Sequence, residues 1–220
     1  MKNNHLSDLE VKSLELIENS FIENSSISTT SFGLTSAVLI NLISQTNLEI
    51  PIVFIDTGFH FYETIDYYKK IIEMYPKLNF IRISPNLNKE EFLEKHGRNV
   101  YNEDPDFCCD NNKVTPLKNY LEREGIKTWY AAVRRSQSDF RKSLNERENI
   151  REDLIKVHPL LCWTESDIDK YIKANSLPSH PLLKQGYESI GCYPCTKVGV
   201  NRSGRWQNFV KTECGLHYCK

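Results

Sequence analysis

The hydrophobic positions of this chain follow two periods, one typical of helices and one typical of buried strands. Residues 6–22 carry apolar side chains at helical spacing, which predicts a packed amphipathic helix. Residues 50–56 (IPIVFID) are β-branched and almost wholly apolar, as expected for a strand that is buried on both faces. By the same reasoning, further strands are predicted at residues 27–30, 79–85, 128–133 and 154–158, and further helices at residues 34–44, 61–75, 89–96, 113–125 and 165–174.

The alternation of strands and helices predicts the fold class. Successive parallel strands need crossover helices, so we predict an α/β fold, a three-layer α/β/α sandwich with a mainly parallel sheet. We predict one domain over residues 1–220, built from an N-terminal helical segment (1–25), an α/β core (26–177) and a C-terminal active-site segment (178–220). In that last segment the periodicity gives way to Pro, Gly and Cys.

Composition and charge exclude several classes of function. Lysine and arginine (28) nearly balance aspartate and glutamate (29), so no overall charge attracts the chain to nucleic acid or to an anionic membrane. No apolar stretch approaches the length of a membrane span, and the N-terminal sequence MKNNHLSDLE has no signal-like apolar run. We therefore expect a soluble, cytoplasmic protein that binds neither nucleic acid nor membrane. Seven cysteines in that compartment favour metal or redox chemistry over a disulfide scaffold.

Three loops follow predicted strands at their carboxyl ends, where open parallel sheets bind ligands. The loop at 29–33 (TTSFG) leads into a helix and offers hydroxyls, backbone amides and a helix N-terminus to an anion. In the loop at 56–58 (DTG), Asp56 either bonds a sugar hydroxyl or caps a turn. The loop at 134–138 (RRSQS) carries two arginines, which are either a solvated surface pair or, beside the other two loops, ligands that would hold phosphate or sulfate through forked hydrogen bonds. The candidate ligands in these loops are Ser31, Phe32, Gly33, Thr57, Gly58, Arg134 and Arg135.

Four cysteines are candidate ligands of a metal centre. Cys108 and Cys109 are adjacent, just before a predicted helix, and Cys192 and Cys195 form a Cys-x-x-Cys pair. Four thiolates suit either tetrahedral zinc or an iron–sulfur cluster. Neighbouring helical residues point about 100° apart, so both Cys108 and Cys109 reach a larger cluster more easily than a zinc ion. Buried thiols without a metal are the third alternative. Lys113, one turn after Cys109, is placed to bring a positive charge near the metal centre and the ligand.

The C-terminal segment adds a further thiol and several cations. Cys214 begins the sequence Cys-Gly-Leu-His, and a cysteine becomes a nucleophile where neighbouring cations lower its pKa. Arg202, Arg205 and His217 are the candidate cations. A lone cysteine near a C-terminus is otherwise commonly inert, and Cys219 reads as an exposed bystander or as a partner that resolves Cys214.

Together these motifs resemble the assimilatory adenylyl-sulfate (APS) and phosphoadenylyl-sulfate (PAPS) reductases. The most specific parts are ECGLH at 213–217, GRW at 204–206 and GYESIGC at 186–192, with RRSQS and DTG in support. Within this family, Cys-Cys plus Cys-x-x-Cys is similar to the branch that carries a [4Fe–4S] cluster, typically the APS reductases. The resemblance implies an adenine-nucleotide α-hydrolase-like sandwich. It also implies that the cluster ligands are Cys108, Cys109, Cys192 and Cys195.

The resemblance further implies thiol-dependent reduction of APS to sulfite and AMP, in assimilatory sulfate reduction and cysteine biosynthesis. Cys214 would attack the sulfur of APS, expel AMP and become an S-sulfocysteine. A thioredoxin- or glutaredoxin-like dithiol would then release sulfite, and a homo-oligomer is expected. The sulfate would be held by Lys113, Arg134, Arg135, Arg202, Arg205 and His217, and the adenosine side by residues 31–33 and 57–58.

The chain departs from the family pattern at several positions. Ala132 stands where Gly is usual, Tyr62 where Pro is usual, and the loop from Cys195 to Arg202 is several residues shorter. PAPS, or both nucleotides, is therefore an alternative substrate. A more remote alternative is an ATP pyrophosphatase, whose Ser-Gly-Gly-x-Asp-Ser signature is replaced here by SFGLTS. Another is a non-catalytic metal- or cluster-stabilised nucleotide-binding protein, which would not need the Cys214 thiol.

Overall fold

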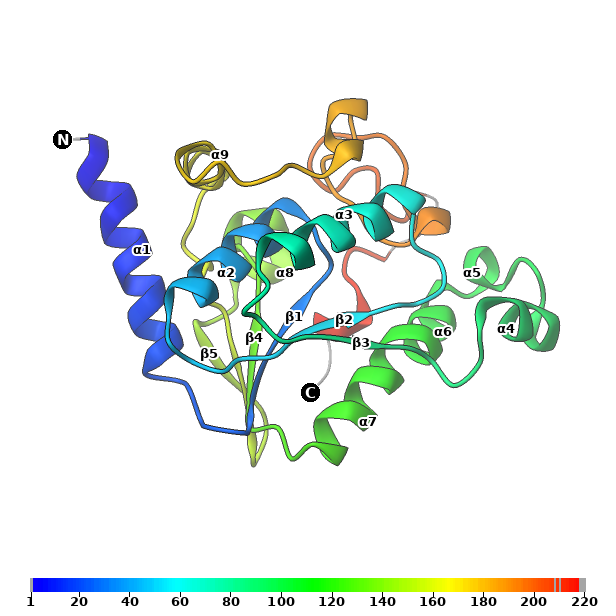
Figure 1. The fold of residues 1–220 in the computed structure, drawn as a ribbon. Helices are drawn as coiled ribbons and strands as arrows, with labels where there is room; N and C mark the ends of the chain where they lie inside the picture. Colours follow the sequence, from blue (N-terminus) through cyan, green and yellow to red (C-terminus); the bar gives the residue numbers. More distant parts are fainter. Residues whose placement is uncertain (1, 208, 210, 218–220) are drawn as a thin grey trace.

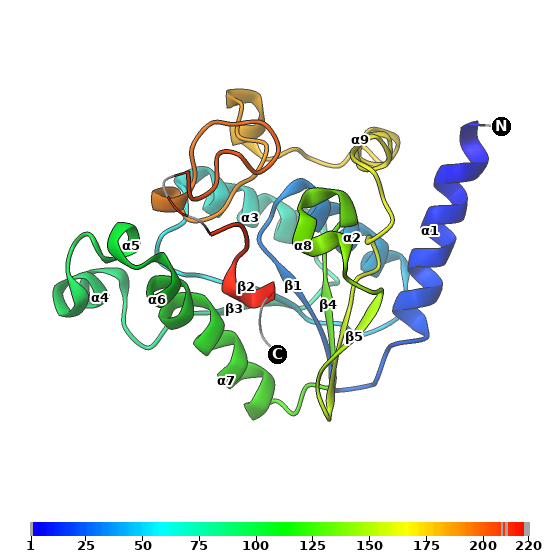
Figure 2. The same ribbon diagram turned by 180° about the vertical axis from the view of Figure 1, so that it is seen from behind.

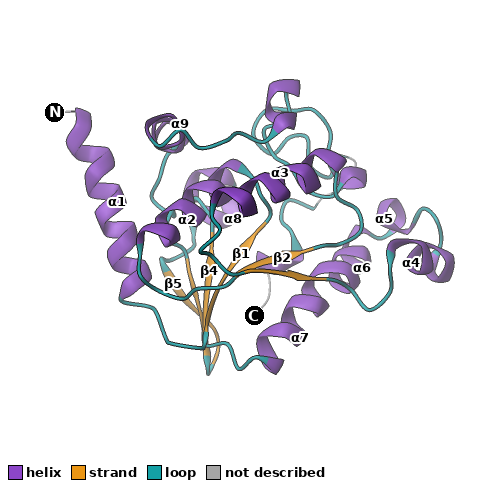
Figure 3. Cartoon of the chain, in the orientation of Figure 1, coloured by secondary structure: helices purple, strands orange, loops and turns teal. Residues whose placement is uncertain are grey.

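A computed structural model describes residues 2–207, 209 and 211–217. Figures 1 and 3 show a twisted sheet with helices on both of its faces, so the predicted three-layer α/β sandwich is confirmed. The sheet has the strand order β3-β2-β1-β4-β6-β5, and all neighbours are parallel except β5 and β6. Its strands are β1 (Ser26–Thr30), β2 (Ile52–Ile55), β3 (Phe80–Ile83), β4 (Thr128–Ala131), β5 (Arg147–Arg151) and β6 (Leu154–Val157).

The strand order places a ligand crevice between β1 and β4. From β1 the chain builds outward through β2 to β3, and it then returns to the other side of β1 to form β4. Thr29 is paired with Val53 on one side and with Ala131 on the other, so β1 lies at the centre of the sheet. Because the two crossovers leave the sheet in opposite directions, the loops after β1 and β4 diverge and leave an opening at their carboxyl ends.

The two faces of the sheet bury separate hydrophobic clusters, and β2 shows how the sequence divides them. Ile52 and Phe54 face a cluster formed with α1 (Lys2–Glu18), α2 (Leu34–Gln45), α3 (Tyr62–Met74) and α9 (Glu165–Ala174). Val53 and Ile55 face the opposite cluster, which is covered by α7 (Thr115–Arg123). Since alternate side chains of a strand point to opposite faces, only a wholly apolar strand satisfies both layers. No helix in the described ranges is both long and apolar enough to cross a membrane.

Short helices not predicted from the sequence surround the cysteine segment and the loop after β4. They are α5 (Val100–Glu103), α6 (Pro105–Cys109) and α8 (Asp139–Lys142), whereas α4 (Lys89–His96) has its predicted bounds. The helix predicted at 113–125 begins instead at Thr115, and a π-helical turn, Asp110–Val114, joins it to α6. Such turns widen a helix locally and are frequent at functional sites.

The C-terminal segment folds back against the rest of the chain. Figures 1 and 2 show its last described residues, 211–217 in red, passing between the sheet and the run of α6 and α7. A Cβ atom on Gly215 would lie 2.8 Å from a methyl carbon of Val114, so this segment packs directly on the π-helical turn. Leu216 packs against the apolar cluster under α7. Cys214 and Leu216 therefore reach the crevice between β1 and β4 from the α7 side.

Candidate active site

A cleft opens at the crevice between β1 and β4. Its walls come from the loops after these strands, the first turns of α2 and α9, and the C-terminal segment. The structure gathers several sequence-predicted site residues in this cleft although they are far apart along the chain. Those that line it are Ser31, Gly33, Lys113, Arg134, Arg202, Arg205 and Cys214.

The first turn of α2 provides the anion-binding end of this cleft. Gly33 is the N-cap of α2, and it has no side chain to accept a hydrogen bond from the first turn. The backbone N–H groups of Leu34, Thr35 and Ser36 have no partner within the helix at these positions, and all three residues line the cleft. The helix dipole adds a partial positive charge at the same end. This turn therefore suits a phosphate group.

Phe32, predicted as a ligand, lies in the core instead. Its φ is +56°, in the left-handed region, and its backbone N–H donates to Thr30 Oγ1 at 3.0 Å. The ring is fully buried and packs on Phe54 and Tyr68, with centroid distances of 5.0 and 5.1 Å. Phe32 therefore fixes the conformation of the loop from below, while its neighbours Ser31 and Gly33 face the cleft.

The loop after β2 also points away from the cleft. Asp56 accepts hydrogen bonds from the Gly58 amide at 3.0 Å and from Arg82 Nε at 2.9 Å, so its carboxylate closes the turn. Burial raises the pKa of Asp56, but the hydrogen bonds from Gly58 and Arg82 hold that pKa below its usual value. Thr57 Oγ1 lies 3.3 Å from Cys192 Sγ, and Gly58 adopts a φ of +74° against Lys89.

The remaining predicted ligands divide between surface and undescribed positions. Arg135 is exposed, and its guanidinium donates to the carbonyl of Leu144 at 3.3 Å rather than lining the cleft. The side chain of His217 and the whole of Cys219 lie outside the described part of the chain. Of the two adjacent arginines, only Arg134 lines the cleft.

The four predicted metal-ligating cysteines line one small pocket next to the cleft. Cys108, Cys109, Cys192 and Cys195 all border it, although they come from α6 and from a loop more than eighty residues later. Burial, followed by the charge of Cys192, raises the pKa of Cys108 to about 12. In the parts of the chain that the structure describes, no group of three or more His, Cys, Asp and Glu side chains is arranged to hold a single metal ion.

Polar side chains next to the cysteine pocket contact the sulfur atoms of Cys108 and Cys192. Asn112 Nδ2 lies 3.7 Å from Cys108 Sγ, and Lys113 Nζ lies 4.0 Å from Cys192 Sγ. Lys113 lies in the π-helical turn and borders both the pocket and the cleft. Burial alone would lower the pKa of Lys113, but the charges of the neighbouring thiolates, Cys192 first, raise it overall. The side chain of Lys113 therefore lies between the cysteine pocket and the cleft.

Cys214 lies at the junction of the cleft and the cysteine pocket. Its thiol shares a hydrogen bond with Cys109, and this contact lowers the pKa of Cys214 well below the usual value for cysteine. Burial opposes that shift, whereas the charges of Lys113 and Arg205 and the Leu216 backbone N–H add to it. The thiolate form is the nucleophilic form of cysteine.

The short loop after Cys195 closes as a tight hairpin, which places Arg205 against the ring of Trp206. Lys197 N donates to Gly204 O at 2.8 Å, and Trp206 N donates to Cys195 O at 3.2 Å. Arg205 stacks on the Trp206 ring, with its Cζ 4.2 Å from the centroid. Its guanidinium also passes so close to Gly191 that a Cβ there would lie 2.5 Å from Arg205 Cζ. Gly191 is thus required for this close approach.

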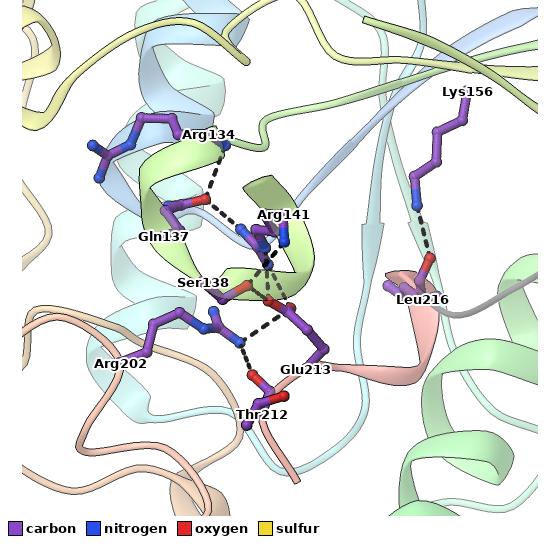
Figure 4. Close-up of polar contacts among 9 residues, drawn as sticks. All are labelled: Arg134, Gln137, Ser138, Arg141, Lys156, Arg202, Thr212, Glu213 and Leu216. Atoms are coloured by element: carbon purple, nitrogen blue, oxygen red, sulfur yellow. Dashed lines mark hydrogen bonds and ion pairs between the residues drawn. The ribbon is translucent and has the colours of Figure 1, made fainter. Parts of the chain in front are cut away.

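A buried carboxylate that the sequence interpretation did not single out holds the C-terminal segment in place. Figure 4 shows Arg141 and Arg202 facing Glu213, and Lys156 reaching the carbonyl of Leu216. Burial, and then the charge of Arg141, lowers the pKa of Arg202 to about 10. Glu213 lies in the ECGLH motif, but no periodicity or spacing in the sequence indicates that Arg141 or Lys156 contacts this segment. Only the folded chain brings them together.

Comparisons with known proteins agree with this geometry. Residues 25–198 match the family described as the phosphoadenosine phosphosulfate reductase domain. A protein of Bacillus cereus (strain Q1) named adenosine 5′-phosphosulfate reductase is 42% identical over 186 residues, covering 82% of this chain and 79% of that protein. A protein of the same name from Geobacillus thermodenitrificans (strain NG80-2) is 43% identical over 187 residues, covering 82% of this chain and 78% of its own. The crystal structure of phosphoadenylyl-sulfate reductase from Candida auris, a phosphate complex, is similar with a TM-score of 0.74 at 28% identity, covering 90% and 98% of the two chains.

Proposed function

This chain belongs to the phosphoadenosine phosphosulfate reductase family, and we propose that it reduces APS to sulfite and AMP with electrons from a dithiol protein. The observation that carries the proposal is the position of Cys214. Its thiol lies in the wall of the same cleft that offers the free amides of α2 and the guanidinium of Arg205. A nucleophile, an anion-binding helix end and cations around one cavity suit the transfer of a sulfonyl group from a nucleotide.

The first half-reaction forms a covalent intermediate on Cys214. Its thiolate attacks the sulfur of APS, a sulfur–sulfur bond forms, and the sulfur–oxygen bond to AMP breaks. AMP leaves with that electron pair, and the protein then carries an S-sulfocysteine. AMP is a good leaving group, so the main tasks of the site are to align the sulfur with Cys214 and to neutralise the sulfate charge. Lys113, Arg202 and Arg205 line the same cleft as Cys214, and we assign the neutralisation of the sulfate charge to them.

The second half-reaction needs two electrons from outside the chain. A thiolate of a thioredoxin- or glutaredoxin-like protein attacks Cys214 Sγ, and sulfite leaves with the electron pair of the sulfur–sulfur bond. The second thiol of that partner resolves the mixed disulfide and frees Cys214. The balance is one APS and one dithiol consumed, and one AMP, one sulfite, one disulfide and two protons formed.

We also propose that the working protein is a homo-oligomer.

The residues of the cysteine pocket fit a [4Fe–4S] cluster. Four thiols from two segments border one pocket, and Thr57, Asn112 and Lys113 offer hydrogen bonds to their sulfur atoms. Sulfur ligands supported in this way are typical of iron–sulfur sites. When bound, the cluster would supply a fixed charge beside Lys113 that helps to position the sulfate. The electrons come from the dithiol, so no step of the reaction passes through it.

Sulfite release by protein purified without oxygen tests the proposed function. Wild type, Cys214→Ser and Cys162→Ser would each be given APS or PAPS with a reduced thioredoxin, and iron and sulfide would be measured in the same samples. We expect sulfite from APS with wild type and with Cys162→Ser, because Cys162 is exposed outside the cleft. We expect none with Cys214→Ser. Equal activity in Cys214→Ser would overturn the mechanism, a higher kcat/KM with PAPS would overturn the choice of APS, and absence of iron would overturn the cluster.

A further inference from the structure

The residue before the proposed nucleophile is a carboxylate that is completely shielded from solvent. Glu213 is 0% exposed, and both of its oxygens accept hydrogen bonds. Oε1 accepts from Ser138 Oγ at 2.5 Å and from Arg141 Nε at 2.9 Å. Oε2 accepts from Arg141 Nη2 at 2.9 Å and from Arg202 Nη2 at 3.3 Å. Figure 4 shows this carboxylate enclosed by its donors.

A buried carboxylate is stable only where its hydrogen bonds are fully made, so this arrangement restricts where the chain can run. The two parallel hydrogen bonds from Arg141 fix the carboxylate in direction as well as in distance. Arg141 is itself 5% exposed and donates to Gln137 Oε1, which also accepts from the Arg134 amide at 3.0 Å. The C-terminal segment is therefore attached through α8 to the rigid loop after β4.

A second attachment lies on the other side of Cys214. Lys156, on β6, donates to the carbonyl of Leu216 at 2.7 Å. Cys214 thus lies between a contact through its preceding residue and a contact two residues later, and both contacts lead to the sheet. Glu213 does not border the cleft, whereas Cys214 does. The carboxylate therefore acts on a ligand in the cleft only indirectly, by way of Cys214 and of its partners Arg141 and Arg202, which also border the cleft.

We propose that Glu213 is a positioning residue, which through Arg141 and Ser138 fixes the backbone of Cys214 so that its thiol meets the sulfur of the bound nucleotide. The inference rests on the proposed function, because it assigns Glu213 a part in the same reaction. A misplacement of about 1 Å far from the reacting atoms can lower a rate roughly a hundredfold. Glu213 thus controls the transfer rate and leaves the affinity for AMP unchanged, because AMP lacks the sulfate that Arg202 would hold.

The test compares Glu213→Gln and Glu213→Asp with wild type. The matched control is Glu122→Gln, since Glu122 forms an exposed ion pair with Arg151 at 3.2 Å outside the cleft. Four quantities are measured: the single-turnover rate of S-sulfocysteine formation at saturating APS, the Kd for AMP, the Tm, and the rate of trypsin cleavage after Lys211. For Glu213→Gln we expect a transfer rate lower by about thirtyfold or more and faster cleavage after Lys211. The AMP Kd should stay within about twofold, whereas the Tm should fall by roughly ten degrees, because the buried Arg141 loses its charged partner.

Glu213→Asp keeps the charge, so it should recover part of the rate that Glu213→Gln loses, while Glu122→Gln should behave as wild type. An unchanged transfer rate in Glu213→Gln would overturn the inference. A loss of AMP affinity in step with the transfer rate would also overturn it, because Glu213 would then maintain the whole nucleotide site rather than position the thiol. If wild type itself releases no sulfite, the proposed function fails, and the cleavage rates still decide whether Glu213 anchors the segment.

Discussion

The ammonium group of Lys156 donates a hydrogen bond to the carbonyl oxygen of Leu216 at 2.7 Å. The same group lies 3.7 Å from the centroid of the Trp129 ring, so the charge is also stabilised by the face of an aromatic side chain. Lys156 is 3% exposed and belongs to β6, whereas Leu216 follows the proposed nucleophile by two residues. Strand β6 of the sheet thus holds the C-terminal segment at Leu216.

Lys156→Met should therefore lower turnover about tenfold while changing global stability little. The partly buried Leu216 carbonyl loses a hydrogen bond, which costs about 1–3 kcal/mol, but the desolvation cost of the buried ammonium group disappears at the same time and offsets part of this loss. The loss should fall on kcat, since the Leu216 carbonyl is left without this donor and the Cys214 segment moves. Steady-state kinetics and urea unfolding measure the two effects. Lys127→Met, at an exposed position before β4, is the control, and an equal loss in both variants would contradict the prediction.

Gly191→Ala should weaken substrate binding without unfolding the protein. The added Cβ would lie 2.5 Å from Arg205 Cζ, and the end of a flexible side chain can move aside where backbone cannot. The guanidinium then leaves its place on Trp206 and loses a charge-assisted contact to the sulfate, which is worth roughly 1.5 kcal/mol or about tenfold in KM. Kinetics with APS and a thermal melt test this. A KM equal to that of wild type would show that Arg205 does not bind the substrate.

The acidic residues of α9 should bias the cleft against a second phosphate. Glu165 and Asp169 are exposed, lie one turn apart and border the cleft beside Arg134. Burial lowers the pKa of Arg134, and the two carboxylates act against that shift, so they lie within electrostatic range of this arginine.

Replacing both carboxylates by amides (Glu165→Gln with Asp169→Asn) should raise the ratio of kcat/KM for PAPS to that for APS by about fivefold to tenfold at low salt. Each like-charge repulsion at a few ångströms in water is worth about 1 kcal/mol, and added salt screens it. The control is Glu152→Gln, which changes an exposed charge in the turn between β5 and β6. An unchanged ratio would place the nucleotide ribose away from α9.

Acid should destabilise the protein through His158. This side chain is 1% exposed, and its Nδ1 donates to the carbonyl of Asn145 at 2.9 Å, while its buried Nε2 has no hydrogen-bond partner among the described residues. Burial lowers the pKa of His158 from 6.5 to about 4. Between these two values the unfolded chain binds a proton that the folded chain does not, so stability is complete above pH 6.5 and falls as the pH drops toward 4.

The loss attributable to His158 should approach about 3 kcal/mol by pH 4. Urea unfolding of wild type and His158→Gln between pH 7 and pH 4.5 provides the comparison. The variant should be less stable at pH 7 but should lose less stability on acidification. A pH dependence identical to that of wild type would mean that His158 titrates alike in the folded and unfolded states.

The sequence predicts correctly those helices and strands whose intrinsic propensity and hydrophobic period agree with their packing in the fold. The apolar run around β2, the helix Lys89–His96 and the helix Glu165–Ala174 appear where periodicity places them. β5 was missed because its sequence, RENIR, is polar, and only the antiparallel pairing with β6 makes it a strand. The sequence also did not predict the π-helical turn before Thr115. This turn depends on packing around Lys113 and the C-terminal segment rather than on local helix propensity.

The sequence by itself determined the fold class, because hydrophobic period is a local property of a chain. Motif spacing, which is also local, singled out the Cys-Cys and Cys-x-x-Cys motifs, the thiol of Cys214 and the arginines near it in the sequence. Only the tertiary structure decided which of those residues share a cavity. In the folded chain Phe32 is buried in the core, Thr57 lines the cysteine pocket and Arg135 is exposed. The side chains packed around each of these residues decide its orientation, and they come from distant parts of the sequence. The tertiary structure also brings Glu213 into contact with Arg141, which lies 72 residues earlier in the chain. A buried carboxylate without an oppositely charged partner is strongly destabilising, so the fold has to supply one.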